Sequence, residues 1–373
     1  MSQDKLLLKD KLFNSNKIEQ LANEIHAVYN DFQKERFIKE VIVILPTLEL
    51  KQRISHITKC LYKLFPQDYP QAIEIILKAL PPILDPHKED NDFWDFIYAP
   101  YAEFVANYGC TDNFLKLSFY ALQEITMRFS AEFAIREFYC QFPKETFKQM
   151  KLRALNKNYH IRRLASEWSR LYLPRWKKIP LLPYQWLELL ELLRKDKTSY
   201  VLRSVANHCN DISKKYPQLI LDTISRWGKI NYHTKKTMSY LTHHALRTLI
   251  KQWNTNALQY IGYFEPRIKN HKLTIHTPKV SLWSPLVFSF EGQSEIDQMI
   301  YFTYNIQYKG TSSKNRSKIF ILWKNSYKKN EKITLTKKHI IKPMTTRHVY
   351  LWEHYISILS HGIVIAQQSF IVV

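Results

Sequence analysis

The sequence contains no apolar run long enough to cross a membrane. No segment reaches the roughly 18 consecutive apolar residues that a spanning helix requires. The N-terminal residues MSQDKLLLKDKLF contain three consecutive leucines with acids on both sides, which is not the pattern of a signal peptide. The sequence therefore excludes membrane insertion and predicts a cytoplasmic protein.

Paired cysteines and spaced metal ligands are also missing. The four cysteines, Cys60, Cys110, Cys140 and Cys209, are scattered without a CxxC motif, which favours free thiols in a reducing compartment. The 14 histidines include no HExxH motif or similar ligand spacing. We therefore expect free cysteines and no structural metal.

Acidic residues are scarce relative to basic ones. The chain has 55 Lys and Arg against 33 Asp and Glu, a formal net charge of +22, and its pI is near 9.6. Such an excess predicts a polyanionic partner, with nucleic acid as the first candidate and an anionic membrane surface as the second. A generally basic, AT-rich proteome, indicated by the many Lys, Asn and Ile residues, would explain part of the excess.

Glycine is rare, with six residues in the chain, and residues 1–265 carry one helical stripe after another. Tyr159, Tyr200 and Tyr240 open similar segments at spacings of 41 and 40 residues. A period of about 40–47 residues with two or three helices is typical of HEAT and armadillo repeats. This part of the sequence predicts an α-solenoid in which one helix of each repeat lines a continuous concave face.

After about Glu265 the pattern changes to short aromatic and β-branched segments. Along Tyr301–Tyr308, large apolar residues occupy alternate positions, which indicates a strand. About seven such strands predict an immunoglobulin-type β-sandwich at 279–373, after a linker at 266–278. Its Lys-rich turns suit a second contact with DNA, although solvated loops explain any single lysine equally well. The predicted fold class is mainly α, a HEAT-like repeat α-solenoid at 1–265 followed by a smaller immunoglobulin-like β-sandwich.

One stretch concentrates charge and aromatic rings around an acid. The segment HIRRLASEWSRLYLPRW, His160–Trp176, places Glu167 among arginines and tryptophans. These neighbours are Arg162, Arg163, Arg170, Arg175, Trp168 and Trp176. One interpretation is a solvated helix end with an i,i+4 pair of Arg163 and Glu167. The other is a reaction centre in a nucleic-acid groove, with arginines for phosphates, aromatic faces for a base and a carboxylate for developing positive charge.

Two more acids occupy related positions in the repeat. Glu167 and Asp211 lie eight and eleven residues after the tyrosines that open their repeats, a difference of about one helical turn. Glu132, 35 residues before Glu167, falls on the preceding inner helix of the predicted layout. We expect the three carboxylates to converge on one groove, where their mutual repulsion requires a cation. The simpler alternatives are an i,i+4 pair of Glu132 with Arg136 and a solvated helix end at Asp211.

These segments together resemble the AlkC branch of the AlkC/AlkD alkylpurine DNA glycosylases over nearly the whole chain. The resemblance rests on DFWDFIYAPYAEFVANYG (Asp92–Gly109), FSAEFAIREF around Glu132, RRLASE…LPRW around Glu167, and YVLRSVANHCNDISKKYP around Asp211. The C-terminal sandwich also resembles the immunoglobulin-like domain that part of this branch carries.

The resemblance implies a DNA repair enzyme. It implies a HEAT-like solenoid that hydrolyses the N-glycosidic bond of cationic alkylated bases in double-stranded DNA and leaves an abasic site. The implied substrates are 3-methylcytosine, 1-methyladenine and 3-methyladenine, released without the base flipping that most glycosylases use. No metal and no cofactor is implied. We also expect a monomer that acts on the nucleoid of a bacterial-type cytoplasm.

The match to the family motifs assigns the acids. Glu132 and Glu167 are expected to face the sugar, and Asp211 is expected to position the attacking water. A base alkylated at a ring nitrogen is already cationic and leaves without a general acid. The remaining barrier is the oxocarbenium-like sugar and the placement of water, and carboxylates serve both needs.

The expected DNA- and lesion-binding residues are arginines and tryptophans near these acids. They are Trp168, Trp176, Arg163, Arg170, Arg175 and Arg203. Trp176 matches the aromatic wall of the family, and Arg170 and Arg203 match its phosphate contacts. The family usually has a glycine where this chain has Trp168, and one residue fewer before the later tryptophan, so Trp168 is the alternative wall.

A function of a different class fits the charge without needing the acids. A non-catalytic HEAT-repeat scaffold would bind DNA or RNA through charge and shape alone. It does not require three convergent carboxylates, so loss of the acids would leave its function unchanged. The two hypotheses therefore differ in how acid-to-amide variants affect binding and base release.

Overall fold

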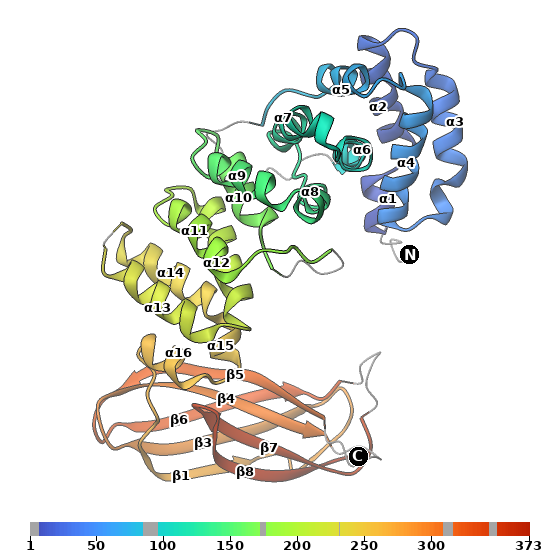
Figure 1. The fold of residues 1–373 in the computed structure, drawn as a ribbon. Helices are drawn as coiled ribbons and strands as arrows, with labels where there is room; N and C mark the ends of the chain where they lie inside the picture. The colour runs from blue at the N-terminus through green and yellow to red at the C-terminus, as the bar shows by residue number, and fades with distance from the viewer. Residues whose placement is uncertain (1–6, 85–95, 172–176, 231, 309–315, 343–348) are drawn as a thin grey trace. The chain divides into compact units, whose positions relative to one another are not determined.

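The chain forms a helical unit followed by a mainly β unit. The computed structural model describes residues 7–84, 96–171, 177–230, 232–308, 316–342 and 349–373. Contacts divide the chain into two compact units, Met1–Ala245 and Leu246–Val373 (Figure 1). Within the described residues, no helix is both long and apolar enough to cross a membrane. The predicted fold class, an α-solenoid followed by a smaller β-sandwich, is confirmed.

The first unit is built from α-helices joined by short connections and single 3₁₀ turns. Its helices are α1 (Leu8–Leu12), α2 (Ser15–Val28), α3 (Lys34–Ile44), α4 (Leu50–Leu64), α5 (Tyr69–Lys78), α6 (Ala99–Gly109), α7 (Leu115–Thr126), α8 (Ile135–Gln141), α9 (Pro143–Ala154), α10 (Tyr159–Trp168), α11 (Pro183–Leu193), α12 (Ser199–Ser213), α13 (Pro217–Gly228) and α14 (Lys235–Ala245). The 3₁₀ turns are Leu45–Thr47, Phe96–Tyr98 and Asp112–Phe114. Proline begins α9, α11 and α13, where its missing N–H costs no helical hydrogen bond.

The helices around the candidate acids form two packed layers. α10, α12 and α14 pack side by side, while α9 packs on α10 and α11, and α11 and α13 pack on α12. Tyr159 begins α10 and Tyr200 lies in the first turn of α12, and their rings meet edge to face with centroids 6.0 Å apart. The repeat spacing of the sequence therefore places equivalent positions of α10 and α12 next to each other.

The second unit contains a β-sandwich of two sheets. Its strands are β1 (Ile268–Ile275), β2 (Lys279–Val280), β3 (Pro285–Ser294), β4 (Gln298–Tyr308), β5 (Arg316–Tyr327), β6 (Lys332–Ile340), β7 (Glu353–Ser360) and β8 (Ile363–Val372). One sheet has the order β1-β3-β6 and the other the order β2-β8-β7-β4-β5. Phe302, Tyr304 and Ile306 of β4 lie in the core with Phe288 and Phe290 of β3, which confirms the alternation expected from the sequence.

The expected linker at 266–278 is wrong, because most of it is a strand. β1 pairs antiparallel with β3, with Leu273 opposite Phe290. The strand lies at the edge of its sheet among the described residues, and half of its side chains are exposed. The alternation of apolar residues that would have identified it is therefore weak.

The division between the units also lies earlier than the expected position 265. α15 (Arg247–Lys251) and α16 (Thr255–Tyr260) belong to the second unit. Trp253 and Tyr263 both pack on Tyr301 of β4, with ring centroids 5.6 and 5.7 Å apart. The β7–β8 turn contributes Gly362, at φ +78°, where a Cβ would approach the Cβ of Trp253 to 2.9 Å. The two short helices are therefore part of the packed β unit.

This boundary predicts the stability of two fragments. A fragment of residues 246–373 should unfold cooperatively, whereas one of residues 266–373 should lose roughly 2–3 kcal/mol, because the buried Tyr301 ring becomes exposed. Thermal and urea unfolding followed by circular dichroism measure the difference. Trp253→Ala in the longer fragment serves as the control and should give part of the loss. Equal stability of the two fragments would contradict the boundary at Leu246.

Candidate active site

The three candidate acids lie on three separate structural elements. Glu132 lies in the turn before α8, Glu167 in the last turn of α10 and Asp211 near the end of α12. The expectation that Glu132 lies on a helix is wrong, because α8 begins at Ile135. Glu167 and Asp211 occupy the neighbouring helices that the repeat spacing predicts.

Arg163 joins the first two acids. Its Nη2 lies 2.7 Å from Oε1 of Glu132 and 3.6 Å from Oε2 of Glu167. Nη1 donates to the hydroxyl of Ser130 at 2.8 Å, and that hydroxyl donates to Glu132 at 2.9 Å. The guanidinium also lies over the ring of Tyr200, 5.0 Å from its centroid. Arg163 thereby fixes the turn before α8 against α10 and α12.

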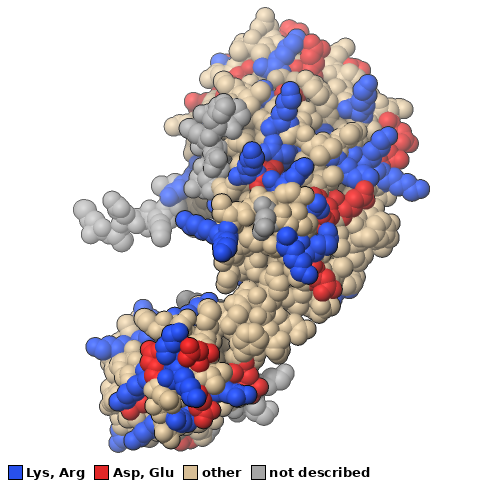
Figure 2. All heavy atoms as spheres, turned by 90° about the vertical axis from the view of Figure 1, so that its left-hand side faces the viewer, with Lys and Arg blue, Asp and Glu red and all other residues tan. Residues whose placement is uncertain are grey.

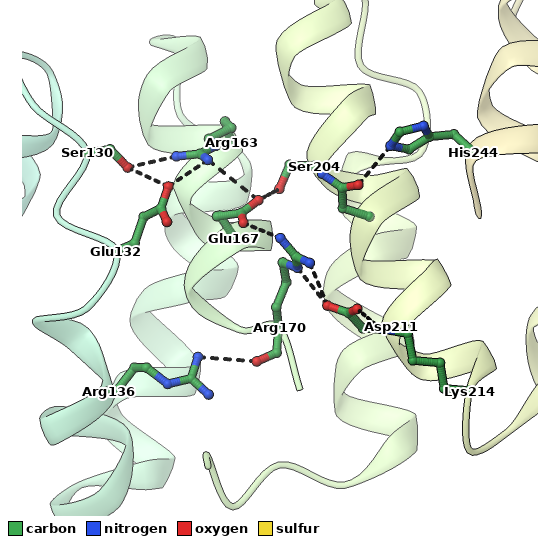
Figure 3. Close-up of polar contacts among 11 residues, drawn as sticks. Ser130, Glu132, Arg136, Arg163, Glu167, Arg170, Ser204, Asp211, Lys214 and His244 are labelled. Atoms are coloured by element: carbon green, nitrogen blue, oxygen red, sulfur yellow. Dashed lines mark hydrogen bonds and ion pairs between the residues drawn. The ribbon is translucent and has the colours of Figure 1, made fainter. Parts of the chain in front are cut away.

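Arg170 joins the second acid to the third. Its Nη1 donates to Oε1 of Glu167 at 2.5 Å, and its Nε and Nη2 lie 2.8 and 2.7 Å from Oδ2 of Asp211 (Figure 3). Lys214 lies 2.9 Å from the other oxygen of Asp211, and Ser204 donates to Oε2 of Glu167 at 2.7 Å. Acids and bases therefore alternate from Glu132 through to Lys214.

The centre of this row is buried and the two ends reach solvent. The side chains of Glu167 and Asp211 are 6% and 3% exposed, against 29% for Glu132 and 39% for Lys214. Burial alone would raise the pKa of Glu167, but Arg163, Arg170 and Ser204 together outweigh burial and hold that pKa below its usual range. Glu167 is therefore an ionised carboxylate at neutral pH.

The cations that the acids require are supplied by the chain itself. Burial disfavours the charged form of Arg163 and Arg170, but their carboxylate partners more than compensate and raise both pKa values. His208, buried on α12 beside Arg170, has its pKa lowered to about 3, first by burial and then by Arg170, so it adds no charge. Three acids and three bases leave the row electrically balanced.

Comparisons with known proteins relate this geometry to a family. Residues 269–373 match the model of the C-terminal Ig-like domain of the uncharacterised protein YhaZ. The chain is 32% identical over 357 residues to the uncharacterized protein YhaZ of Bacillus subtilis (strain 168), which covers 94% of this chain and 96% of that protein. Its structure is similar to that of the Pseudomonas fluorescens alkylpurine DNA glycosylase AlkC bound to DNA containing an abasic site analog. That match has a TM-score of 0.84 and 29% identity, and covers 98% of this chain and 99% of the other. The chain belongs to the AlkC branch of the AlkC/AlkD family.

Sequence analysis gave each acid a simpler interpretation as part of a helical ion pair or a solvated helix end. In this member of the AlkC branch, the structure contradicts each of these interpretations in one respect. Arg163 and Glu167 do form an i,i+4 pair, but they are buried rather than at a solvated helix end. Arg136 does not pair with Glu132, because it donates to backbone carbonyls of Arg170 and Lys177. Asp211 is 2% exposed and is not a solvated helix end.

The expected lesion- and DNA-binding residues have different outcomes. Trp168 is fully buried, so its expected role as an aromatic wall is wrong, because a side chain inside the helix layers has no face for a ligand. Arg203 is half-buried on α12, and its phosphate contact stays a prediction. Arg175 and Trp176 lie outside the described residues.

Arg163 and Arg170 each bridge two carboxylates, and of these contacts the sequence predicted only the pair of Arg163 with Glu167. Each guanidinium is shared between two carboxylates and is 10% or 14% exposed at the side chain, so binding to phosphate stays a prediction for both. Ser130, Ser204 and Lys214 were missed altogether. Ser204 lies seven residues before Asp211, two helical turns along the same face, and this spacing is the signal that could have found it.

A narrow pocket opens beside Arg163 on the side of Tyr200. Its lining residues are Leu84, Thr126, Ser130, His160, Arg163, Leu164 and Tyr200. Water-sized molecules can occupy about 10 Å³ within it, far less than the roughly 300–1,000 Å³ of ordinary ligand pockets. Ser130 and Arg163, which contact Glu132, therefore line a recess that is too small to hold a nucleobase.

The pKa of Glu167 predicts how stability depends on pH. Its folded pKa lies below the unfolded value of about 4.3, so ionised Glu167 adds stability above that value, and the contribution is lost as pH falls through the folded pKa. Glu167→Gln should therefore cost roughly 1–3 kcal/mol at pH 7 and less below pH ~4. Urea unfolding of both proteins across this pH range measures the difference.

An exposed acid provides the control for this experiment. Glu188 pairs with Lys151 at the surface, where its side chain is 46% exposed, so Glu188→Gln should change stability little at any pH. A destabilisation by Glu167→Gln that is the same at pH 7 and at low pH would show that ionisation of Glu167 does not contribute.

Proposed function

We propose that this protein is a DNA glycosylase that hydrolyses the N-glycosidic bond of cationic alkylated bases in double-stranded DNA. The product is an abasic site, and the substrates are 3-methylcytosine, 1-methyladenine and 3-methyladenine. The observation that carries the proposal is the row of Glu132, Glu167 and Asp211, held by arginines across neighbouring repeats. Membership of the AlkC branch supports it, because a relative of known structure is an alkylpurine DNA glycosylase bound to DNA.

The chemistry of these lesions matches a site that has carboxylates but needs no acid. Alkylation at a ring nitrogen gives the base a positive charge, so the base is a good leaving group without protonation. Positive charge then develops on the sugar as the bond breaks, and fixed carboxylates stabilise it. Because the folded pKa of Glu167 lies below its usual range, this carboxylate is ready to do so at neutral pH.

Each acid has a proposed role that follows from its surroundings. Glu132 is the most exposed of the three, so it and its neighbour Glu167 are proposed to face the sugar. Asp211 receives two hydrogen bonds from Arg170 and one from Lys214. That fixed orientation suits a carboxylate that accepts a hydrogen bond from the attacking water.

The small size of the recess beside Arg163 favours release without base flipping. A flipped base requires a pocket that encloses it and reads its edge. The recess beside Arg163 is smaller than an ordinary ligand pocket. We therefore propose that the base stays in the duplex while the sugar is presented to the carboxylates.

Duplex DNA is the proposed partner of both units. The net charge of +22 supports binding through phosphates, and Figure 2 shows lysine and arginine side chains spread over the visible face with acids between them. Such binding is largely independent of sequence and weakens as salt rises. We propose a monomeric protein that acts on DNA in the cytoplasm.

The proposal predicts that substitution of one acid lowers base release without weakening DNA binding. Glu167→Gln should lower the release of 3-methylcytosine from a duplex by roughly 10²–10³-fold, while duplex affinity stays nearly unchanged, because phosphate contacts dominate affinity. Single-turnover assays that detect abasic sites, together with binding measurements on an undamaged duplex, test both statements.

Two controls accompany this test. Glu188→Gln removes an exposed acid and should leave release unchanged. A duplex with uracil, a neutral base, should be left intact by the wild-type protein, because no acid is placed to protonate it. Equal losses of binding and release in Glu167→Gln would make the acid structural and favour the non-catalytic scaffold.

A further inference from the structure

We propose that Arg136 is a positioning residue of the candidate active site, which holds the backbone of Arg170 so that its guanidinium stays between Glu167 and Asp211. This inference rests on the proposed function. Arg136 lies in the first turn of α8, four residues after Glu132, and Figure 3 shows its side chain directed at the carbonyl of Arg170. Arg136 is proposed to act through Arg170 and not to touch DNA.

The burial of Arg136 without an acid is unusual. Its residue is 2% exposed, and among the described residues no carboxylate contacts it. Its Nη2 is buried without a hydrogen-bond partner in the described part of the chain. Burial lowers the pKa of this guanidinium. A buried arginine that is paired only with carbonyls is costly, and the carbonyls that Arg136 contacts indicate what it does.

The hydrogen bonds of Arg136 define that role. Nε donates to the carbonyl of Lys177 at 2.5 Å, and Nη1 donates to the carbonyl of Arg170 at 3.2 Å. One side chain therefore holds the backbone on both sides of residues 171–176. Two neighbours on α8 support the second attachment, since Glu137 pairs with Lys177 at 2.8 Å and Cys140 donates to the carbonyl of Lys178 at 3.7 Å.

The position of Arg170 matters because its side chain is the connection between two acids. Its guanidinium reaches Glu167 on α10 and Asp211 on α12 only while its backbone is held just beyond the end of α10. Misplacement of a catalytic group by about 1 Å costs on the order of 10²-fold in rate. Glu132 lies in the turn just before α8, which carries Arg136. Arg136 therefore also couples the position of Glu132 to that of Arg170.

Arg153 on α9 offers a matched control. It is also buried, at 4% exposure, and also lacks an acidic partner among the described residues. It donates to the carbonyl of Phe119 at 2.5 Å and to the side chain of Gln149 at 3.1 Å. It contacts neither the acids nor the residues next to them, so its loss reports the effect of removing a buried arginine alone.

The experiment compares Arg136→Gln, Arg136→Lys and Arg153→Gln in the full-length protein. Single-turnover release of 3-methylcytosine from a duplex should fall about 10–100-fold in Arg136→Gln, with unchanged duplex affinity. Arg136→Lys should recover part of the rate, because an ammonium group can donate to one of the two carbonyls but cannot reach both as the planar guanidinium does. Arg153→Gln should lower thermal stability while keeping the wild-type rate. An unchanged rate in Arg136→Gln, or an equal loss of rate in Arg153→Gln, would overturn the proposal.

Hydrogen exchange at the backbone gives a second result that does not depend on activity. The amides of Ser169, Arg170, Lys178 and Ile179 should exchange faster in Arg136→Gln than in Arg153→Gln. Equal exchange in the two variants would overturn the positioning role. If the wild-type protein releases no alkylated base, the proposed function fails, and the exchange data still decide the role of Arg136. Should Arg136→Gln fail to fold, Arg136→Lys replaces it in both measurements.

Discussion

The guanidinium of Arg170 is the contact on which the candidate active site depends. It lies between Glu167 on α10 and Asp211 on α12, and it makes hydrogen bonds to both. Two carboxylates this deeply buried would repel each other and take up protons if they had no cation. The solenoid brings the acids together by stacking α10 against α12, and Arg170 forms ion pairs with both of them there. Arg163 repeats the arrangement between Glu167 and Glu132.

This arrangement explains how a strongly basic protein can carry a site for positive charge. The net charge of +22 favours DNA phosphates, while the three acids are confined to one balanced row with three bases. The catalytic benefit then lies in orientation rather than in net negative charge, because the carboxylate dipoles are fixed before the sugar becomes cationic. Glu132 has the most exposed carboxylate of the row, and we propose it as the first contact for the sugar.

Much of this picture could be predicted from the sequence. Its long motifs identified the AlkC branch, and the repeat spacing placed Glu167 and Asp211 on adjacent helices, because spacing along a helix fixes which face a residue occupies. The spacing of residues does not predict the direction of a side chain at a helix end. Trp168 follows Glu167 directly, yet it points into the core while Glu167 meets the arginines. Spacing also cannot reveal that arginines pair across repeats, since that depends on tertiary packing. β1 was missed because an edge strand with half of its side chains exposed and one buried carries little apolar alternation.

The central claim is that fixed carboxylates stabilise a cationic sugar, and binding to a charged mimic tests it most directly. Two duplexes would be compared, one with a cationic pyrrolidine in place of the damaged nucleotide and one with the neutral tetrahydrofuran of the same shape. Since groups that stabilise a transition state bind its mimic more tightly, the wild-type protein should prefer the pyrrolidine by about 10²-fold or more, and Glu167→Gln should lose most of this preference. Equal affinity of the wild-type protein for the two duplexes would contradict the claim.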